Sequence, residues 1–142
     1  MRTVGRDRIV SVVVLAASAI ACAGCIERRD GLPSASCGED PAPPTWTRVS
    51  AEVMRPSCGT VACHSTLSRK AGVVLDSAAA GYPSLMNAEP EPFVRAGEPA
   101  ASRLMYLLIG GEVEKLMPPD APLADVEIEL VARWICAGAR DD

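Results

Sequence analysis

Large aromatic side chains are scarce in this sequence. Its 142 residues include one Phe, two Tyr and two Trp, although 49% of the residues are hydrophobic. A core with so few rings has to be filled by aliphatic side chains or by a bulky group from outside the chain. The scarcity of rings therefore favours a domain that holds a large apolar cofactor.

Histidine and clustered positive charge are scarce as well. His64 is the only histidine, which excludes metal sites built from several histidines and Ser-His-Asp triads that use any other histidine. The 18 acidic residues outnumber the 14 Lys and Arg residues, and no stretch is rich in Lys and Arg. Binding to nucleic acid depends on such a stretch, so we expect no nucleic-acid partner.

The apolar run near the N-terminus is too short to span a bilayer as a stable helix. It covers residues 9–21 and follows a segment that contains three arginines. This order is typical of a signal peptide. The sequence Ala-Gly-Cys that ends at Cys25 resembles the lipobox, where a bacterial lipoprotein is cleaved and acylated. Cys22 is the competing acylation site, and an ordinary secretory signal is the alternative interpretation.

The number of cysteines favours acylation at Cys25. Six cysteines in a short chain indicate an oxidising compartment or a cofactor. Cleavage before Cys22 would leave one unpaired thiol, whereas cleavage before Cys25 leaves an even set, namely Cys37, Cys58, Cys63 and Cys136. We therefore predict a periplasmic protein with a lipid anchor on Cys25. Ile26 is not the acidic residue associated with inner-membrane retention, which favours the outer membrane.

Composition divides the chain into three segments. Residues 1–24 are the predicted signal peptide. Residues 25–45 form a proline-rich tether that cannot bury enough apolar area to fold alone, and residues 46–140 form the predicted domain. Loss of the signal peptide removes three arginines and one aspartate, which makes the remaining chain more negative. A partner protein is therefore expected to offer a basic surface.

The spacing of apolar residues predicts one helix in the first part of the domain and another in its middle. The first helix is expected to end before Pro56, and its apolar positions are Trp46, Val49, Val53 and Met54. A later helix is expected to begin near Pro99 and to stop at Gly110. The stretch between them, residues 65–98, is expected to be irregular because it is rich in Gly, Pro, Ser and Ala.

A last helix is predicted near the C-terminus. Asp125 is its expected N-cap, and Gly138 is expected to end it. Its expected buried face consists of Val126, Leu130, Val131, Trp134 and Ile135. About three short helices joined by long loops would make a poorly stabilised domain without a further group in the core.

The string C-x4-C-H, residues 58–64, contains the residue types for a chemical site. In the usual c-type haem attachment, C-x-x-C-H, two thiols add across the haem vinyl groups and the next imidazole becomes the proximal iron ligand. Cys58, Cys63 and His64 offer these groups here. The two extra residues have to loop out, and Gly59 supplies conformational freedom for this. A Cys58–Cys63 disulfide with a surface histidine, a zinc site and a Cys–His nucleophilic pair are the alternatives.

Met117 is the best candidate for the distal iron ligand. It lies on a loop and is followed by two prolines, which fix its backbone and keep it out of a helix. Met54 and Met105 fit helical core positions, and Met86 is ambiguous. A loop methionine that only covers the core is the alternative for Met117.

Four motifs in residues 46–139 together resemble a class I cytochrome c domain with one haem, particularly the planctomycete-type cytochrome c domains of bacterial lipoproteins. They are Arg-Pro-Ser-Cys (55–58) leading into Cys63-His64, Gly-x-Pro-x-x-Ser-x-Leu (97–104), Met-Pro-Pro (117–119) with Pro-Leu (122–123), and Arg-Trp-Ile (133–135) before Ala-Gly-Ala (137–139). The resemblance implies an all-α fold in which the first and last helices cross. It also implies one covalent haem c, with Cys58 and Cys63 as attachment residues, His64 as proximal ligand and Met117 as distal ligand.

The function implied by the resemblance is one-electron transfer in the cell envelope by a lipid-tethered carrier that is not itself an enzyme. One alternative is a haem-free, disulfide-stabilised lipoprotein that acts as a binding or scaffold module. Another is a haem protein for sensing or peroxidase chemistry with an open sixth position. Cys37 and Cys136 are predicted to form a disulfide between the tether and the last helix, because free thiols are unusual in an oxidising compartment. Two unpaired buried thiols are the alternative.

Overall fold

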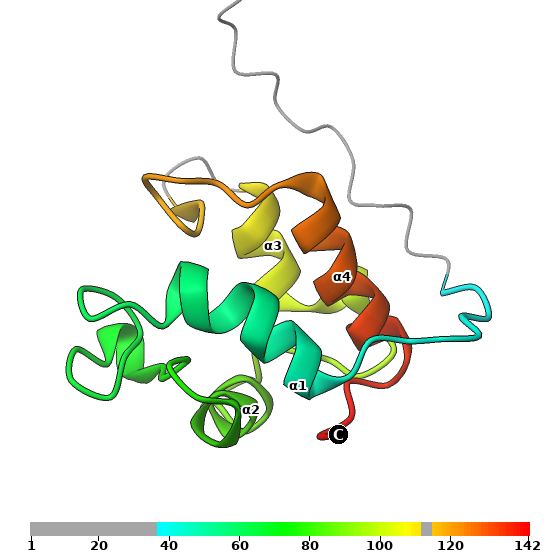
Figure 1. Cartoon of the computed structure of the whole chain (residues 1–142), viewed down its shortest axis with the longest axis horizontal. Coiled ribbons are helices and arrows are strands. Elements are labelled where there is room, and N and C mark those ends of the chain that lie inside the picture. The colour runs from blue at the N-terminus through cyan, green and yellow to red at the C-terminus, as the bar shows by residue number, and fades with distance from the viewer. Residues whose placement is uncertain (1–36, 112–114) are drawn as a thin grey trace, which may run out of the picture.

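The computed structural model describes residues 37–111 and 115–142. The predicted signal peptide, the candidate acylation sites Cys22 and Cys25, and the predicted tether up to residue 36 lie outside the described residues. The described part has helices and no strand, which confirms the predicted all-α class (Figure 1). None of its helices has the length and apolarity needed to cross a membrane. The α-helices are α1 (Trp46–Val49), α2 (Ala78–Met86), α3 (Arg103–Ile109) and α4 (Asp125–Cys136).

The first helical segment is longer than predicted. α1 continues directly into a π-helix, η1 (Ser50–Cys58), and Pro56 lies inside it. The prediction that this helix ends before Pro56 is therefore wrong. The backbone N–H of Gly59 donates to the carbonyl of Met54 at 2.8 Å, the wider spacing of a π-helix. Proline has no N–H to contribute, and this wider winding accommodates it. As a result, Cys58 lies at the end of a continuous helical rod.

The presence of the helix α2 shows that a second prediction is wrong. It lies within residues 65–98, which the sequence predicted to be irregular. Ser77 caps it, because its hydroxyl oxygen accepts a hydrogen bond from the N–H of Ala80 at 3.3 Å. Leu85 is buried, and a Cβ on Gly81 would lie 3.0 Å from the ring of Trp46. Close packing on the core therefore stabilises a helix of small residues with little periodicity of its own.

The helices α3 and α4 lie near their predicted positions. α3 follows a 3₁₀ turn that begins at Pro99, and it ends at Gly110, whose φ is 74°. α4 begins at Asp125, so the N-cap is Ala124 and the predicted cap is wrong by one residue. The carboxylate of Glu127 accepts a hydrogen bond from the N–H of Ala124 at 2.7 Å and satisfies this terminus.

The buried face of α4 differs from the prediction at one residue. Val126 is 71% exposed, whereas the other four predicted positions are buried together with Ile128. Each residue of an α-helix is rotated by about 100° from the previous one, so Val126 and Ile128 point to nearly opposite sides. The core lies on the side of Ile128, which leaves Val126 in solvent.

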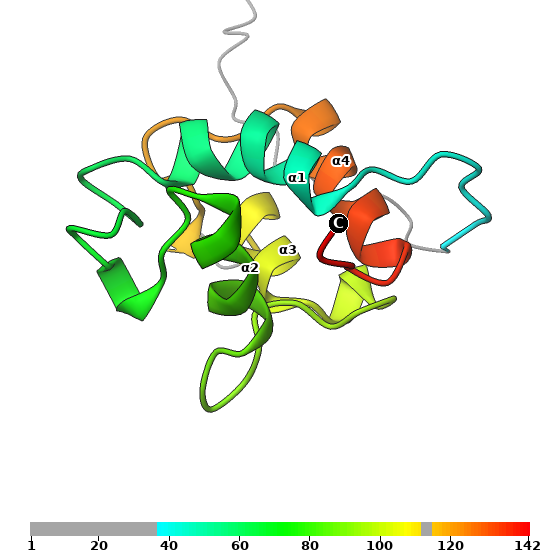
Figure 2. The same ribbon diagram turned by 60° about the horizontal axis from the view of Figure 1, so that its bottom comes forward.

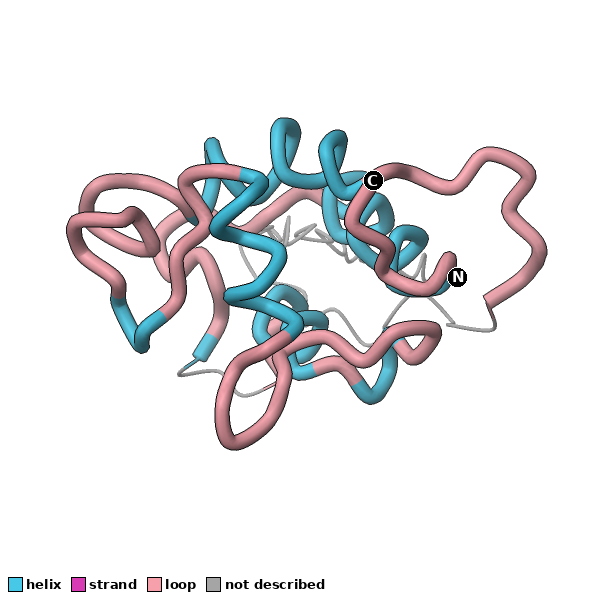
Figure 3. Tube along the Cα trace, turned by 90° about the horizontal axis from the view of Figure 1, so that it is seen from below, coloured by secondary structure: helices cyan, strands magenta, loops and turns pink. Residues whose placement is uncertain are grey.

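The first and last helices pack against each other, as predicted (Figure 2). The rings of Trp46 and Trp134 lie 5.0 Å apart between centroids, and Tyr82 from α2 meets both rings at steeper angles. Met54 and Met105 are fully buried, as their helical spacing predicted. Three of the few aromatic side chains thus form one cluster. Long loops connect the helices (Figure 3).

A disulfide joins Cys37 to Cys136, which confirms the predicted bridge across a sequence separation of 99 residues. Beside it, Arg133 and Asp40 form an ion pair at 2.7 Å. Both contacts attach the segment before α1 to the C-terminal half of α4. They lie at the end of the molecule opposite the loop that contains His64 (Figure 1).

Candidate functional site

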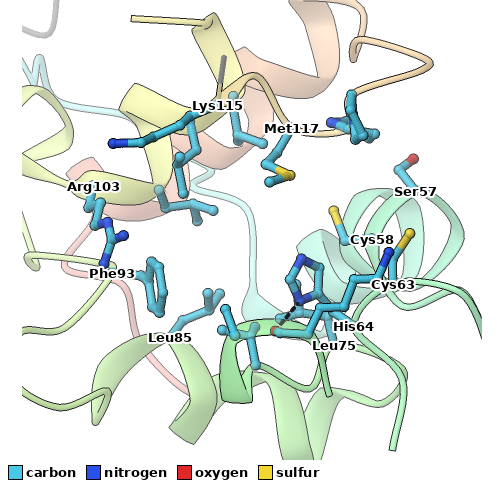
Figure 4. Close-up of a pocket in the computed structure, with 18 residues that line it drawn as sticks. Ser57, Cys58, Cys63, His64, Leu75, Leu85, Phe93, Arg103, Lys115 and Met117 are labelled. Carbon is cyan, nitrogen blue, oxygen red and sulfur yellow. Dashed lines mark hydrogen bonds between the residues drawn. The ribbon is translucent and has the colours of Figure 1, made fainter. Parts of the chain in front are cut away.

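A cavity of about 290 Å³ lies between the end of η1 and the His64 loop on one side and α3 and the Met117 loop on the other. Its wall is mostly apolar, and four of its residues are Leu85, Leu104, Leu107 and Leu108. This volume is at the lower end of the range of about 300–1,000 Å³ for ligand pockets. Cys58, Cys63 and His64 line it together with Met117, which is 53 residues further along the chain than His64 (Figure 4).

A tight turn closes the string from Cys58 to His64. The N–H of Cys63 donates to the carbonyl of Thr60 at 2.9 Å, and the N–H of His64 donates to the carbonyl of Cys58 at 3.1 Å. The additional residues of the C-x4-C spacing are therefore accommodated within one compact turn. Gly59 has an ordinary φ of −76°, so the expectation that it supplies unusual conformational freedom is wrong. Glycine is needed here because the backbone of Leu75 passes close to it.

The two thiols of the string are unbridged. Burial raises the pKa of the Cys58 thiol to about 11, and the nearby Cys63 and Glu127 add to this effect. A protonated thiol is a weak nucleophile, which disfavours the interpretation as a Cys–His nucleophilic pair. Within the described ranges, no group of three or more His, Cys, Asp and Glu side chains is placed to hold a metal ion.

The imidazole of His64 is oriented by its own loop. Its Nδ1 lies 3.0 Å from the carbonyl oxygen of Lys70. A carbonyl can only accept, so Nδ1 is the donor in this hydrogen bond and Nε2 is the nitrogen left for a ligand. The N–H of Lys70 in turn donates to the carbonyl of Cys63 at 3.3 Å. The backbone around the thiols therefore also orients the ring.

The far end of the His64 loop is closed by Asp76. One carboxylate oxygen of Asp76 accepts hydrogen bonds from both the hydroxyl and the N–H of Thr66, each at 2.6 Å. The N–H of Leu75 donates to the carbonyl of His64 at 2.6 Å. These bonds hold the two ends of the loop together behind the imidazole.

The Asp76 contact predicts an acid-sensitive loop. The hydroxyl of Thr66, then its N–H and the charge of Arg69, lower the pKa of Asp76 below its usual value of 3.8. A carboxylate with a lowered pKa stabilises the fold above about pH 4, and this contribution is lost as pH falls through the lower pKa of the folded state. Thr66→Val should raise the pKa of Asp76 toward its usual value. Side-chain carboxyl titration by NMR measures this, and an unchanged pKa would contradict the assignment.

Met117 lies across the cavity from His64 and its sulfur points inward (Figure 4). The N–H of Met117 donates to the carbonyl of Leu107 at 2.9 Å, which attaches the loop to the end of α3. Of the four methionines in the described part of the chain, only Met117 lines the cavity. Met86 is half-buried and packs against the core, which resolves the ambiguity of its sequence position.

Charged and aromatic residues that the sequence did not single out also line the cavity, namely Lys70, Phe93, Arg103 and Lys115. The guanidinium of Arg103 lies 4.9 Å from the centroid of the Phe93 ring, at cation–π distance. Arg103 occupies an unspecified position of the motif at residues 97–104. The sequence therefore contained only an indirect signal for it, and none for Phe93, which lies before that motif.

The chain is similar to one known family in the region of the cavity. Residues 61–121 match the family of Planctomycete cytochrome C. The matched range covers less than half of the chain and includes Cys63, His64 and Met117, whereas Cys58 lies just before it. No curated protein and no solved structure matches the chain. Together with the helical fold, the family match supports a cytochrome c-like domain.

Proposed function

We propose that this domain binds one haem c covalently and transfers single electrons. The observation that supports the proposal is the meeting of two thiols, one imidazole and one thioether, from segments up to 59 residues apart in the sequence, in a single apolar cavity. This set of donors is the one that c-type haem attachment and His/Met iron ligation require. The residues present therefore fit the group, and the scarcity of aromatic rings agrees with an apolar cofactor in the core.

Each residue of the set has a distinct proposed role. Cys58 and Cys63 hold the cofactor through thioether bonds. His64, whose Nδ1 is engaged by Lys70, offers Nε2 as proximal ligand, and Met117 offers its sulfur as distal ligand. When bound, haem supplies a one-electron couple of its iron. The leucines make the wall of the site mostly apolar, and low polarity of this kind is one of the protein's means of setting a redox potential.

The proposed role is that of a carrier and not of an enzyme, because His64 and Met117 would fill both axial positions and leave none for a substrate. We also propose a periplasmic location with a lipid anchor on Cys25, at the outer rather than the inner membrane, and a redox partner with a basic surface. The disulfide between Cys37 and Cys136 supports an oxidising compartment. Labelling with radioactive palmitate should be lost in Cys25→Ala and kept in Cys22→Ala, and the reverse pattern would move the anchor to Cys22.

Covalent haem is the result that tests the proposal. The full chain is expressed in a host with the c-type maturation machinery, and the product is examined by haem staining on a denaturing gel and by a pyridine haemochrome spectrum. We expect one haem per chain, and none in Cys63→Ala. Haem-free protein from a host that matures a control with the same C-x4-C-H spacing would overturn the proposal.

Replacing Met117 should lower the reduction potential. A thioether ligand favours the reduced iron, so Met117→Ala is expected to lower the potential by roughly 0.1–0.3 V, part of the range of about 0.8 V that axial ligands cover. Spectroelectrochemical titration measures this change. Met86→Ala is the matched control, because Met86 does not line the cavity. Equal potentials in the two variants would remove Met117 from the ligand set.

A further inference from the structure

We propose that Arg103 and Lys115 bind the two propionates of the haem. The inference rests on the proposed function, because it concerns the same cavity. It adds the residues that recognise the anionic edge of the cofactor. Neither residue belongs to the set that the C-x4-C-H string and the Met-Pro-Pro motif had identified.

The charge of the cavity wall is the first observation. Three basic residues, Lys70, Arg103 and Lys115, line the cavity, and no carboxylate does so among the described lining residues. The whole chain has the opposite balance, with 18 acidic residues against 14 Lys and Arg. A positive wall in an acidic protein indicates an anionic ligand. Haem carries two carboxylates and meets this requirement.

The position of the cations is the second observation. Arg103 and Lys115 lie on the side of the cavity opposite Cys58 and Cys63 (Figure 4). The two vinyl groups of the porphyrin are on one pair of neighbouring pyrroles, and the two propionates are on the other pair. Attachment of the vinyl edge at the cysteines therefore directs the propionate edge away from them, toward Arg103 and Lys115.

The support of Arg103 is the third observation. Its guanidinium lies over the half-buried ring of Phe93, at 4.9 Å from the ring centroid. The N–H of Leu104 donates to the carbonyl of Phe93 at 2.8 Å, which joins the two segments next to the guanidinium. A guanidinium held in this way can donate two parallel hydrogen bonds to a carboxylate. Lys115 lies on the same loop as Met117, and the hydrogen bond from the N–H of Met117 to the carbonyl of Leu107 attaches this loop to α3, the helix of Arg103.

Four variants of the full chain, matured with haem, test the proposal. Arg103→Gln and Lys115→Gln remove one charge each, and Arg103→Lys keeps the charge but loses the planar fork. Arg48→Gln is the control, because Arg48 is on α1, is paired with Glu52 and does not line the cavity. The readouts are the propionate bending bands in the resonance Raman spectrum and the reduction potential at one pH and ionic strength.

In Arg103→Gln and Lys115→Gln we expect the propionate bending band at lower frequency, because a hydrogen-bond donor to the propionate is lost. We also expect a lower reduction potential, because a positive charge near the haem is lost. Arg103→Lys keeps the charge but not the planar fork, so its reduction potential should lie closer to the wild-type value than the frequency of its propionate bending band does. Arg48→Gln should match the wild type in both readouts. Arg103→Gln and Lys115→Gln spectra and potentials that equal those of Arg48→Gln would overturn the inference.

The outcome also separates this inference from the function on which it rests. A wild-type chain that stains for haem, with Arg103 and Lys115 variants indistinguishable from it, leaves the proposed function intact and rejects the propionate site. A wild-type chain without covalent haem rejects both. If Arg103→Gln fails to mature because its packing on Phe93 is lost, the band and potential of Lys115→Gln decide the question.

Discussion

Replacing Cys37 and Cys136 with serine should lower the free energy of unfolding by up to about 4–5 kcal/mol. The bridge closes a loop of 99 residues, which is nearly the whole domain. In the chain-entropy account, a loop of about 100 residues restricts the unfolded chain by this amount. For a domain of this size, the loss corresponds to a melting temperature lower by roughly 15–30 °C. Thermal unfolding of the mature chain, followed by circular dichroism, measures the effect.

The control for this prediction is a variant of the ion pair next to the disulfide. Asp40→Asn removes the ion pair with Arg133 but leaves the disulfide in place. Both side chains are partly exposed to solvent, and an ion pair that water reaches contributes little to stability. The melting temperature of Asp40→Asn should therefore stay close to that of the wild type. A reductant should lower the melting temperature of the wild type and leave the double serine variant unchanged. If the reductant has no effect on the wild type, the bridge does not stabilise the domain.

Substitution of Gly59 by alanine should disrupt the turn between the two thiols. A Cβ at this position would lie 2.6 Å from the carbonyl oxygen of Leu75 and 2.7 Å from the Cα of Asp76. Both are backbone atoms and cannot rotate away, so the His64 loop has to move off the end of η1. Overpacking of this kind costs roughly 1–3 kcal/mol and sometimes more. We expect reduced stability and a smaller yield of covalent haem, measured by denaturant unfolding and by haem per chain.

Gly38→Ala is the matched control for Gly59→Ala. A Cβ at Gly38 would have nothing within 4 Å. The same change of residue type should therefore leave stability and haem content near the wild-type values. Equal stability and haem yield in the two variants would show that the close approach of Leu75 to Gly59 does not constrain the site.

The helices show how far local pattern predicts this fold. α3 and α4 have strong apolar periodicity and clear end signals, such as Gly110, and the sequence places them within a few residues. α2 lacks such a pattern, because its residues are mostly small, and its stability comes from contacts with Trp46 that are remote in sequence. The predicted burial of Val126 was wrong for a related reason. Hydrophobicity shows that a residue can be buried, but the position of the core relative to the helix decides whether it is.

The residues of the candidate site also fall into those that the sequence identifies and those that only the structure places. The string from Cys58 to His64 and the loop methionine are recognisable from residue types and spacing alone, because thioether attachment and axial ligation require those groups. The role of Gly59 was misread, since the neighbouring backbone of Leu75 is distant in sequence. Lys115 gave no local signal, and Arg103 gave only the indirect one of its place in the motif at residues 97–104. An exposed cation on a helix or a loop has the same appearance with or without a ligand beside it.

The sequence by itself determined the all-α class and the pairing of Cys37 with Cys136, and it predicted the donor set of the proposed site. These follow from helical periodicity, from the chemistry of rare residue types and from the count of cysteines. Only the tertiary structure decided that His64 and Met117 line one cavity, that the carbonyl of Lys70 orients the imidazole, and that Arg103 and Lys115 lie opposite the thiols (Figure 4). Such features depend on distances between segments that are remote in the chain, and these distances are set by the packing of the helices around the core.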